Sequence, residues 1–289
     1  MLSRMVKWVV GSPTKSLAPR GTVGVMAIMK NETDVLREWI QHYRWQGVDK
    51  IFLIDNGSTD DPERFLRNDI DSGFIEFFSR PRPHRQAQHY REVFRTAGIR
   101  RKVEWLVIAD LDEFWFSPIG DLKRGIETIQ ERFDLVYANW VMFGSSGHVV
   151  QPPSVREGFV HRWNVFGGHP STKWICRTYS MRLLRWTTHH KVWGIDSRRV
   201  ISDNLTFRLN HYPIMSRDYF QRIKMTRGDV SAANSDSMRT MDYFEKYDRP
   251  AVVRDTLLAD MVRRSRGEES LADETGKHSG DDTEMKSYG

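Results

Sequence analysis

Two carboxylates separated by one residue, Asp110 and Asp112, directly follow an apolar run over residues 105–109. A short apolar run of this kind is typical of a buried strand, and where the strand ends both carboxylates can reach one cation. Two neighbouring anions are costly unless a cation neutralises them. Oxygen ligands suit Mg²⁺ or Mn²⁺, which also bridge diphosphate oxygens. This Asp-x-Asp pattern predicts a site for Mn²⁺ or Mg²⁺, with a solvated strand end as the alternative.

A second polar group, Asp55-Asn56-Gly57-Ser58-Thr59-Asp60, follows the apolar run at residues 50–54. A carboxylate at a strand end can accept a hydrogen bond from a ribose hydroxyl or a base N–H, and Gly57 lets the backbone approach a ligand closely. The same residues also fit a tight turn before a helix that begins near Asp60-Asp61-Pro62. Both interpretations can hold together.

The elements that position these groups alternate between strands and helices. We expect strands over residues 22–29, 50–54, 74–78 and 105–109, and helices from Val35 to Gly47, after residue 60, and over 86–100. This alternation predicts an α/β domain with a mostly parallel sheet flanked by helices. Because ligands bind beyond the carboxyl ends of such strands, the two polar groups and the loop Lys30–Asp34 should form one site.

The later part of the chain has weaker patterns. We expect a helix at 121–132, a strand at 135–141 and a long ordered loop at 150–172. Short strands are expected near 173–176, 181–185 and 205–210, and helices at 216–227 and 239–264, the last broken at Pro250. One domain over residues 21–266 is therefore predicted, between a flexible leader, residues 1–20, and a disordered acidic tail, residues 267–289.

Charge and cysteine usage limit the class of protein. The net charge is +6, but seven acidic residues and two lysines give residues 267–289 a charge of −5, so the first 266 residues carry +11. A basic body suits anionic partners. The single cysteine, Cys176, excludes an intramolecular disulfide and fits a reducing compartment. Without a run long enough to cross a bilayer, we expect a cytoplasmic protein that can contact the inner face of a membrane.

These motifs, taken in order, resemble the glycosyltransferase family 2-like group and in detail its family 92-like branch. The early motifs are Met29-Lys30-Asn31-Glu32, Glu38-Trp39-Ile40, Asp55–Asp60 and Asp110-Leu111-Asp112-Glu113-Phe114. The later motifs are Phe143-Gly144-Ser145-Ser146-Gly147, His211-Tyr212, Ser216, Phe220, Lys224 and Arg227-Gly228. The resemblance covers roughly residues 22–230.

The resemblance implies a glycosyltransferase A-type fold with a C-terminal acceptor-side helical extension. It implies a hexosyltransferase that takes a nucleotide sugar, foremost a UDP-sugar, and inverts the anomeric carbon. It places the metal, usually Mn²⁺, at Asp110 and Asp112, Asn31 and Glu32 near the nucleotide, and Asp55 near the base or ribose. Asn56, Ser58 and Asp60 join this binding group. A glycan or lipid-linked acceptor and a role in surface polysaccharide synthesis are further expectations.

Catalysis requires two more kinds of group. A divalent cation would neutralise the departing diphosphate, with Lys173, Lys191 or Lys224 assisting. A carboxylate would deprotonate the acceptor hydroxyl: Glu157, which lies at a pattern position of the family, is the first candidate, followed by Glu113 and Asp196. His211 is expected either to complete the metal shell or to contact the diphosphate, with a purely structural histidine as the alternative; His189 and His190 are rivals.

Other classes of function remain open from the residues. A basic nucleic-acid-binding protein would use Arg80–Arg85 and Arg198-Arg199, but neither stretch reads as a helix with one basic face, and we expect no nucleic-acid partner. A catalytically silent sugar-binding protein of the same fold is opposed by the intact pair Asp110 and Asp112. A haloacid-type phosphatase would place such a pair on its first strand, whereas here the pair follows about the fourth.

Overall fold

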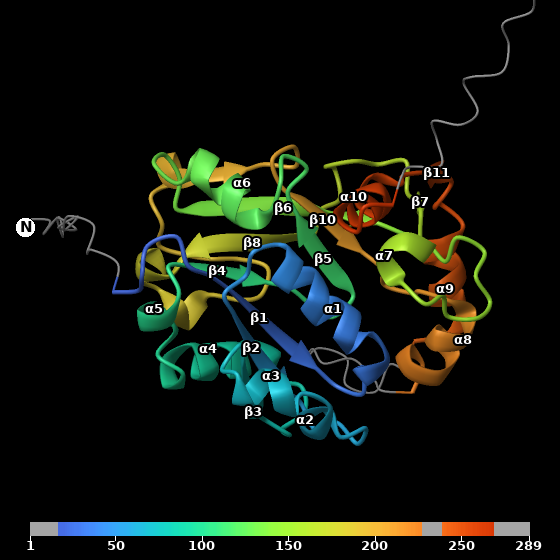
Figure 1. Ribbon diagram of the computed structural model, residues 1–289, viewed down its shortest axis with the longest axis horizontal. Helices are drawn as coiled ribbons and strands as arrows, with labels where there is room; N and C mark the ends of the chain where they lie inside the picture. Colours follow the sequence, from blue (N-terminus) through green and yellow to red (C-terminus); the bar gives the residue numbers. More distant parts are fainter. Residues whose placement is uncertain (1–16, 227–238, 269–289) are drawn as a thin grey trace, which may run out of the picture.

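The computed structural model describes residues 17–226 and 239–268. At its centre is a nine-stranded mixed sheet in the order β3-β2-β1-β4-β8-β6-β10-β5, with β9 beside β6 (Figure 1). The strands are β1 Val23–Met29, β2 Lys50–Asp55, β3 Ile75–Ser79, β4 Trp105–Ile108, β5 Glu113–Phe116, β6 Leu135–Met142, β8 Thr172–Arg177, β9 Val200–Ser202 and β10 Arg208–His211.

The pairing of these strands decides which residues meet at one edge. Strands β3, β2, β1 and β4 are parallel, β8 runs antiparallel to both of its neighbours, and β10 is parallel to β6. The last strand, β5, is antiparallel to β10. The carboxyl ends of β1, β2, β4 and β10 therefore lie at the same edge as the amino ends of β5 and β8.

Helices cover both faces of the sheet, and every residue of β1 is therefore buried. Val25 and Ala27 belong to the core that includes α1, Thr33–Trp45, and α6, Leu122–Ile129. Met26 and Ile28 alternate with them and pack in the core on α4, Gln86–Thr96. Alternate side chains of one buried strand thus supply two hydrophobic cores. Shorter helices complete this half: α2 Pro62–Phe65, α3 Arg67–Asp71 and α5 Ile99–Lys102.

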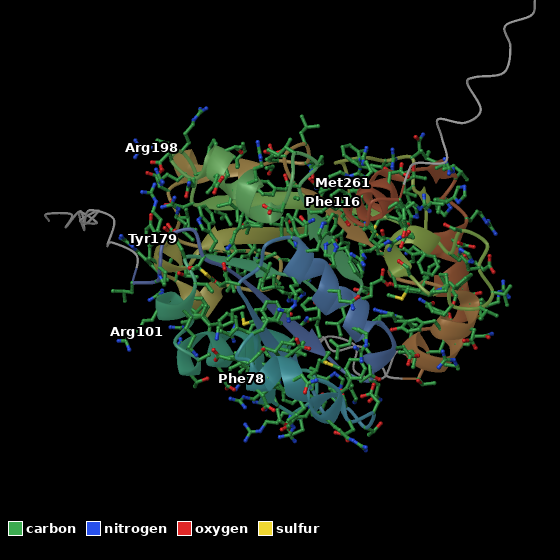
Figure 2. All side chains as sticks on the ribbon, in the orientation of Figure 1. Phe78, Arg101, Phe116, Tyr179, Arg198 and Met261 are labelled. Carbon is green, nitrogen blue, oxygen red and sulfur yellow. The ribbon has the colours of Figure 1, made fainter. Side chains whose placement is uncertain are left out.

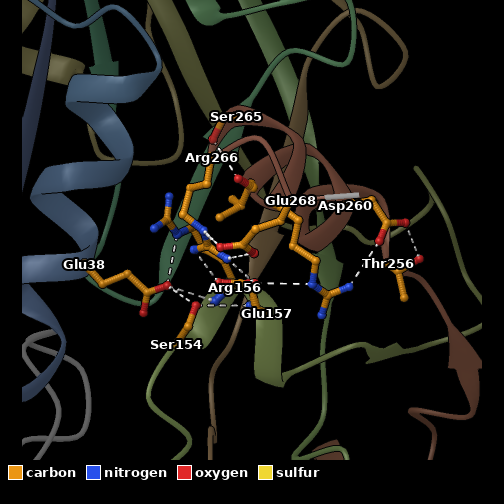
Figure 3. Close-up of polar contacts among 11 residues, drawn as sticks. Glu38, Ser154, Arg156, Glu157, Thr256, Asp260, Ser265, Arg266 and Glu268 are labelled. Carbon is orange, nitrogen blue, oxygen red and sulfur yellow. Dashed lines mark hydrogen bonds and ion pairs between the residues drawn. The ribbon is translucent and has the colours of Figure 1, made fainter. Parts of the chain in front are cut away.

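The C-terminal part is attached to the sheet beside α1. Its elements are α7 Val155–Gly158, β7 His161–Arg162, α8 Arg217–Tyr219, a π-helix Phe220–Lys224, α9 Met241–Asp248, β11 Val253–Arg254 and α10 Leu257–Ser265. Strands β11 and β7 form a separate two-stranded sheet. Glu38 of α1 accepts hydrogen bonds from the Ser154 hydroxyl and from the backbone N–H groups of Val155 and Arg156, so it joins α1 to the start of α7 (Figure 3).

The structure confirms the expected α/β class with a mostly parallel sheet flanked by helices, and it corrects several elements. The strand expected at 181–185 is wrong, because Leu184–Trp186 forms a 3₁₀ turn. Turns of the same kind lie at Thr178–Ser180 and Ser197–Arg199. The helix expected at 86–100 breaks at Gly98, whose φ of 64° is left-handed. The loop expected at 150–172 contains α7 and β7.

The two late helices are also different from expectation. The segment at 216–227 is one turn of α-helix followed by a π-helix, and 239–264 is divided among α9, β11 and α10. Residues 1–16 of the expected leader (1–20), Arg227-Gly228, and residues 269–289 of the expected tail (267–289) lie outside the described residues. Within the described ranges, no helix is long and apolar enough to cross a membrane.

Candidate active site

The turn that carries the carboxylate pair is hydrogen-bonded to side chains of helix α1. The Trp39 indole N–H donates to the Asp110 carbonyl at 3.0 Å. The Tyr43 hydroxyl donates to the Glu113 carbonyl at 3.0 Å and accepts from the Trp115 N–H at 3.1 Å. Both aromatic side chains are wholly buried. The turn between β4 and β5 therefore has a fixed backbone, which is what a ligand-binding pair of side chains requires.

Each carboxylate of the pair contacts a buried lysine. Lys173 Nζ lies 2.6 Å from Asp110 Oδ2, and Lys224 Nζ lies 2.6 Å from Asp112 Oδ2. Both lysine side chains are 0% exposed. Burial raises the pKa of Asp112, but the charge of Lys224 outweighs it and holds this pKa well below its usual range. Lys173 similarly outweighs burial at Asp110, and the net result is a lowered pKa.

Glu113 is part of the same turn but differs from the pair in charge. Its carboxyl accepts a hydrogen bond from the Asp110 N–H at 2.8 Å and lies 3.4 Å from Lys173 Nζ. Burial raises the pKa of Glu113 to about 8, against the opposing charge of Lys173. A protonated Glu113 at neutral pH adds no negative charge beside the pair.

His211 reaches the pair from β10. It pairs with Glu113 in the antiparallel register, and its Nε2 lies 3.6 Å from Asp112 Oδ1. Burial lowers the pKa of His211 despite the charge of Asp112, so the imidazole is neutral and offers a lone pair. Next to it, the Tyr212 N–H donates to the Asp112 carbonyl at 2.8 Å. The sheet register thus places His211 beside Asp112, two of the three residues that the sequence singled out for a metal.

A cluster of aromatic rings, which the sequence analysis missed, lies beside His211. The Trp140 ring on β6 lies 4.2 Å from the His211 ring, 5.4 Å from that of His169 and 5.6 Å from that of His190, between centroids. His189 contacts His190 at 4.1 Å. Trp140 and His211 are far apart in the sequence, so the position of Trp140 beside His211 could be predicted only from the pairing of their strands.

The loops expected at the nucleotide are joined to each other. The Asn31 N–H donates to the Ser58 hydroxyl at 3.0 Å, and Asn31 Oδ1 accepts from the Thr59 N–H at 2.7 Å. Asp60 accepts from Thr33, and Asp55 accepts from the Ser58 N–H at 3.0 Å. The loops after β1 and β2 therefore form one continuous surface.

The remaining members of the binding group extend this surface on both sides. The Asn56 side-chain amide donates to the carbonyls of Arg80 and Arg82, in the loop after β3. Glu32 lies 3.4 Å from Lys224 Nζ and is thereby connected to Asp112. The binding of a nucleotide by these residues stays a prediction.

Glu157 lies apart from this cluster in its contacts. Its carboxylate forms two 2.8 Å hydrogen bonds with Arg266 and lies 3.4 Å from Arg263 (Figure 3). Hydrogen bonding from Arg266 lowers the pKa of Glu157. Among the contacts of the described residues, none joins Glu157 to the carboxylate pair. Asp196 caps the 3₁₀ turn that begins at Ser197 and pairs with Arg198 at the surface.

The donor atoms at the pair fit a divalent cation. Among the described residues, none gives the buried Asp110 Oδ1 a hydrogen bond, and the 3.6 Å between Asp112 Oδ1 and His211 Nε2 is too long for a hydrogen bond. With Glu113 protonated, Glu32 and the pair carry three negative charges against two from Lys173 and Lys224. Within residues 17–226 and 239–268, no three His, Cys, Asp or Glu side chains converge closely enough to hold a metal, so binding requires a local adjustment.

Comparison with known proteins adds an independent finding. A family model described as glycosyltransferase family 92 matches residues 22–273. The chain is similar to a glycosyltransferase family 92 protein of Ricinus communis, with 28% identity over 33% of this chain and 17% of the relative. It is also similar to one of Oryza sativa subsp. japonica, with 30% identity over 44% of this chain and 22% of the relative. The matched segments span about a fifth of these relatives.

Among solved structures, S. aureus TarS 1–349 in complex with UDP-GlcNAc is similar at a TM-score of 0.46 and 12% identity. The match covers 85% of this chain and 73% of that one. At this TM-score the likeness carries no argument about the site.

Proposed function

The chain belongs to glycosyltransferase family 92, and from this premise we propose that it transfers a sugar from a nucleotide-sugar donor to a hydroxyl acceptor. One observation carries the proposal: Asp110 and Asp112 lie at the sheet edge where β1 and β2 also end, and Lys224 connects Asp112 to the loop after β1. A nucleotide along the joined loops would bring its diphosphate to this pair. The carboxyl ends of parallel strands are the usual ligand site of such sheets.

We propose that Asp110, Asp112 and His211 hold Mn²⁺ or Mg²⁺. Oxygen and imidazole donors suit these ions, and Asp110 Oδ1, to which no described residue donates a hydrogen bond, supports the assignment. When bound, the metal supplies a Lewis acid that neutralises the leaving diphosphate. The chain's own part is to hold the pair in place through Trp39 and Tyr43.

The donor is proposed to be a UDP-sugar held by the binding group that the sequence singled out. The backbone N–H groups and side chains of Asn31 and Ser58 already define the shape of this surface. Asp55 and Asp60 keep part of their acceptor capacity for the ribose or base, since a carboxylate has about four lone-pair sites. Glu32 and Asn56 lie at the two ends of this surface.

Glu157 and Glu113 stay our candidates for the catalytic base of an inverting transfer. Glu113 is wholly buried and, with a pKa raised to about 8, would have to lose its proton before it could act as a base, whereas the Glu157 side chain is 18% exposed and so remains first. Replacing a positioned base costs about 10²–10⁴-fold in rate. We expect Glu157→Gln to lower kcat by that range with the fold intact; unchanged kcat in this variant, with a loss in Glu113→Gln, would transfer the role to Glu113.

We further propose a glycan or lipid-linked acceptor in surface polysaccharide synthesis, at the cytoplasmic face of a membrane. The support is the basic stretch at residues 80–101, where Arg82, Arg85 and Arg95 are exposed and Arg101 points outward (Figure 2). Such a surface suits an anionic partner. Binding to acidic vesicles should weaken as salt rises, because exposed charges are screened; salt-insensitive binding argues against this surface.

The test of the function is a screen of UDP-, GDP- and CMP-sugars with the full chain. We expect one class to raise the melting temperature only when Mn²⁺ is present, since a ligand of the folded state stabilises by mass action. Slow hydrolysis of the same donor should follow. Stabilisation without hydrolysis or transfer would favour a silent sugar-binding protein, and salt-sensitive retention on DNA without either would favour nucleic-acid binding.

A further inference from the structure

Lys224 is a buried cation that lies beside two carboxylates within the described part of the chain. Its side chain is 0% exposed, and its Nζ lies 2.6 Å from Asp112 Oδ2 and 3.4 Å from Glu32 Oε1. An ammonium removed from water is costly unless anions compensate it. Lys224 is therefore held in place by the same carboxylate that is proposed to bind the metal.

The two lysines of the site are carried by different kinds of backbone. Lys173 is on β8, where its register partner is Ala138 of β6 and the sheet fixes its main chain. Lys224 is the last residue of the π-helix Phe220–Lys224. Turns of π-helix are rare and recur at functional sites. Lys224 therefore lies on a segment that no strand pairing fixes, unlike Lys173.

We propose that Lys224 competes with a divalent metal for Asp112, and that Glu32 is the partner that keeps the ammonium when the metal takes the carboxylate. The inference rests on the proposed function only in its choice of metal. A singly and a doubly charged cation beside one carboxylate repel each other strongly at this burial. Asp112 accordingly binds the ammonium or the metal well, but not both.

Two opposite effects on metal affinity follow. Removing the ammonium removes the competitor, so the metal should bind more tightly. Removing the charge of Glu32 takes away one of the two carboxylates that the described residues place beside Lys224, which strengthens the pairing of Lys224 with Asp112, so the metal should bind more weakly. Because the weaker metal binding caused by the loss of Glu32 acts through Lys224, it should be smaller in a variant that lacks Lys224.

Calorimetric titration of Mn²⁺ into the full chain, without nucleotide, tests this coupling. We expect Lys224→Met to bind Mn²⁺ at least about tenfold more tightly than the wild type, a change of about 1.4 kcal/mol. Glu32→Gln should bind Mn²⁺ several-fold more weakly than the wild type. When Lys224→Met is already present, the same Glu32→Gln substitution should lower the Mn²⁺ affinity by much less. Lys224→Arg keeps the charge and should stay close to the wild type. Lys123→Met removes an exposed lysine paired with Asp49 and should have almost no effect.

Unchanged or weaker Mn²⁺ binding by Lys224→Met would overturn the proposal, as would additive effects in the double variant or no Mn²⁺ binding by any variant. If Lys224→Met does not fold, as judged by circular dichroism, Lys224→Gln carries the same expectation. Donor turnover by the wild type is measured separately. Absent turnover with tighter Mn²⁺ binding by Lys224→Met refutes the transferase and leaves the competition standing, and turnover without the affinity change refutes only the competition.

Discussion

The Tyr43 hydroxyl is the clearest example of a residue that acts on the site through backbone. It contacts the carbonyl of Glu113 and the N–H of Trp115, so it spans the start of β5. Burial raises the pKa of Tyr43 well above its ordinary value, and the hydroxyl remains a donor at any physiological pH. Its loss would leave two buried backbone groups without their partner.

We predict that Tyr43→Phe lowers the free energy of unfolding by about 1–3 kcal/mol, the cost of leaving buried polar groups unpaired. Mn²⁺-dependent nucleotide binding should weaken with it. Urea unfolding of the variant and of Tyr179→Phe provides the comparison. Tyr179 bonds only to Arg177 among the hydrogen bonds of the described residues, so the control should lose less than about 1 kcal/mol. Equal losses in the two variants would contradict the role given to Tyr43.

Between elements, two carboxylates hold the C-terminal part to the sheet. Glu38 of α1 receives bonds from Ser154, Val155 and Arg156 at the start of α7. Asp255, just after β11, contacts Arg162 Nε at 2.7 Å and Arg208 Nη2 at 2.8 Å. Because Arg162 is on β7 and Arg208 on β10, Asp255 joins three strands from two sheets.

Glu38→Ala should lower the free energy of unfolding by about 2–4 kcal/mol, because several partly buried donors lose one acceptor. The matched control is Glu127→Ala, an exposed glutamate on α6, for which we expect a change within about 0.5 kcal/mol. Guanidinium unfolding of both variants measures the difference. A Glu38 variant as stable as the control would show that α7 is held by other contacts.

Asp255→Asn tests the contribution of Asp255 to stability through the pH dependence of that contribution. Burial raises the pKa of Asp255, but the hydrogen bonds and charges of Arg208 and Arg162 outweigh it and lower the pKa. A lowered folded-state pKa contributes stability that is complete above the unfolded value of about 3.9 and is lost as pH falls through the folded value. The difference in melting temperature between wild type and variant should therefore be largest at pH 7 and should disappear at acidic pH. A gap that stays constant to about pH 2 would contradict this.

For the whole molecule, the sequence predicted the half of the sheet that forms locally. Apolar runs identify β1, β2, β3 and β4, and the polar residues after them mark the correct edge, because parallel neighbours must end together. Strand β8 carries Lys173 to that edge by inserting antiparallel between β4 and β6, which no local pattern reveals. The partner of His211 likewise depends on the β10–β5 register.

The short elements of the second half escaped prediction for a related reason. Met181 and Leu184 are buried in the core on α4, and their three-residue spacing fits the 3₁₀ turns found here rather than the period of two of the expected strand. The contact between Lys224 and Asp112 spans 112 residues, and the role of Lys224 at the diphosphate stays a prediction. Contacts of that separation are decided by packing of the whole domain rather than by neighbouring residues.

The most direct test is calorimetric binding of UDP to the wild type and to Asp112→Ala, each with and without Mn²⁺. We expect the wild type to bind UDP at least about tenfold more tightly with Mn²⁺, and Asp112→Ala to stay folded but show no difference between the two conditions. Equal Mn²⁺ dependence in both proteins would contradict the claim that this carboxylate pair holds the metal beside the nucleotide.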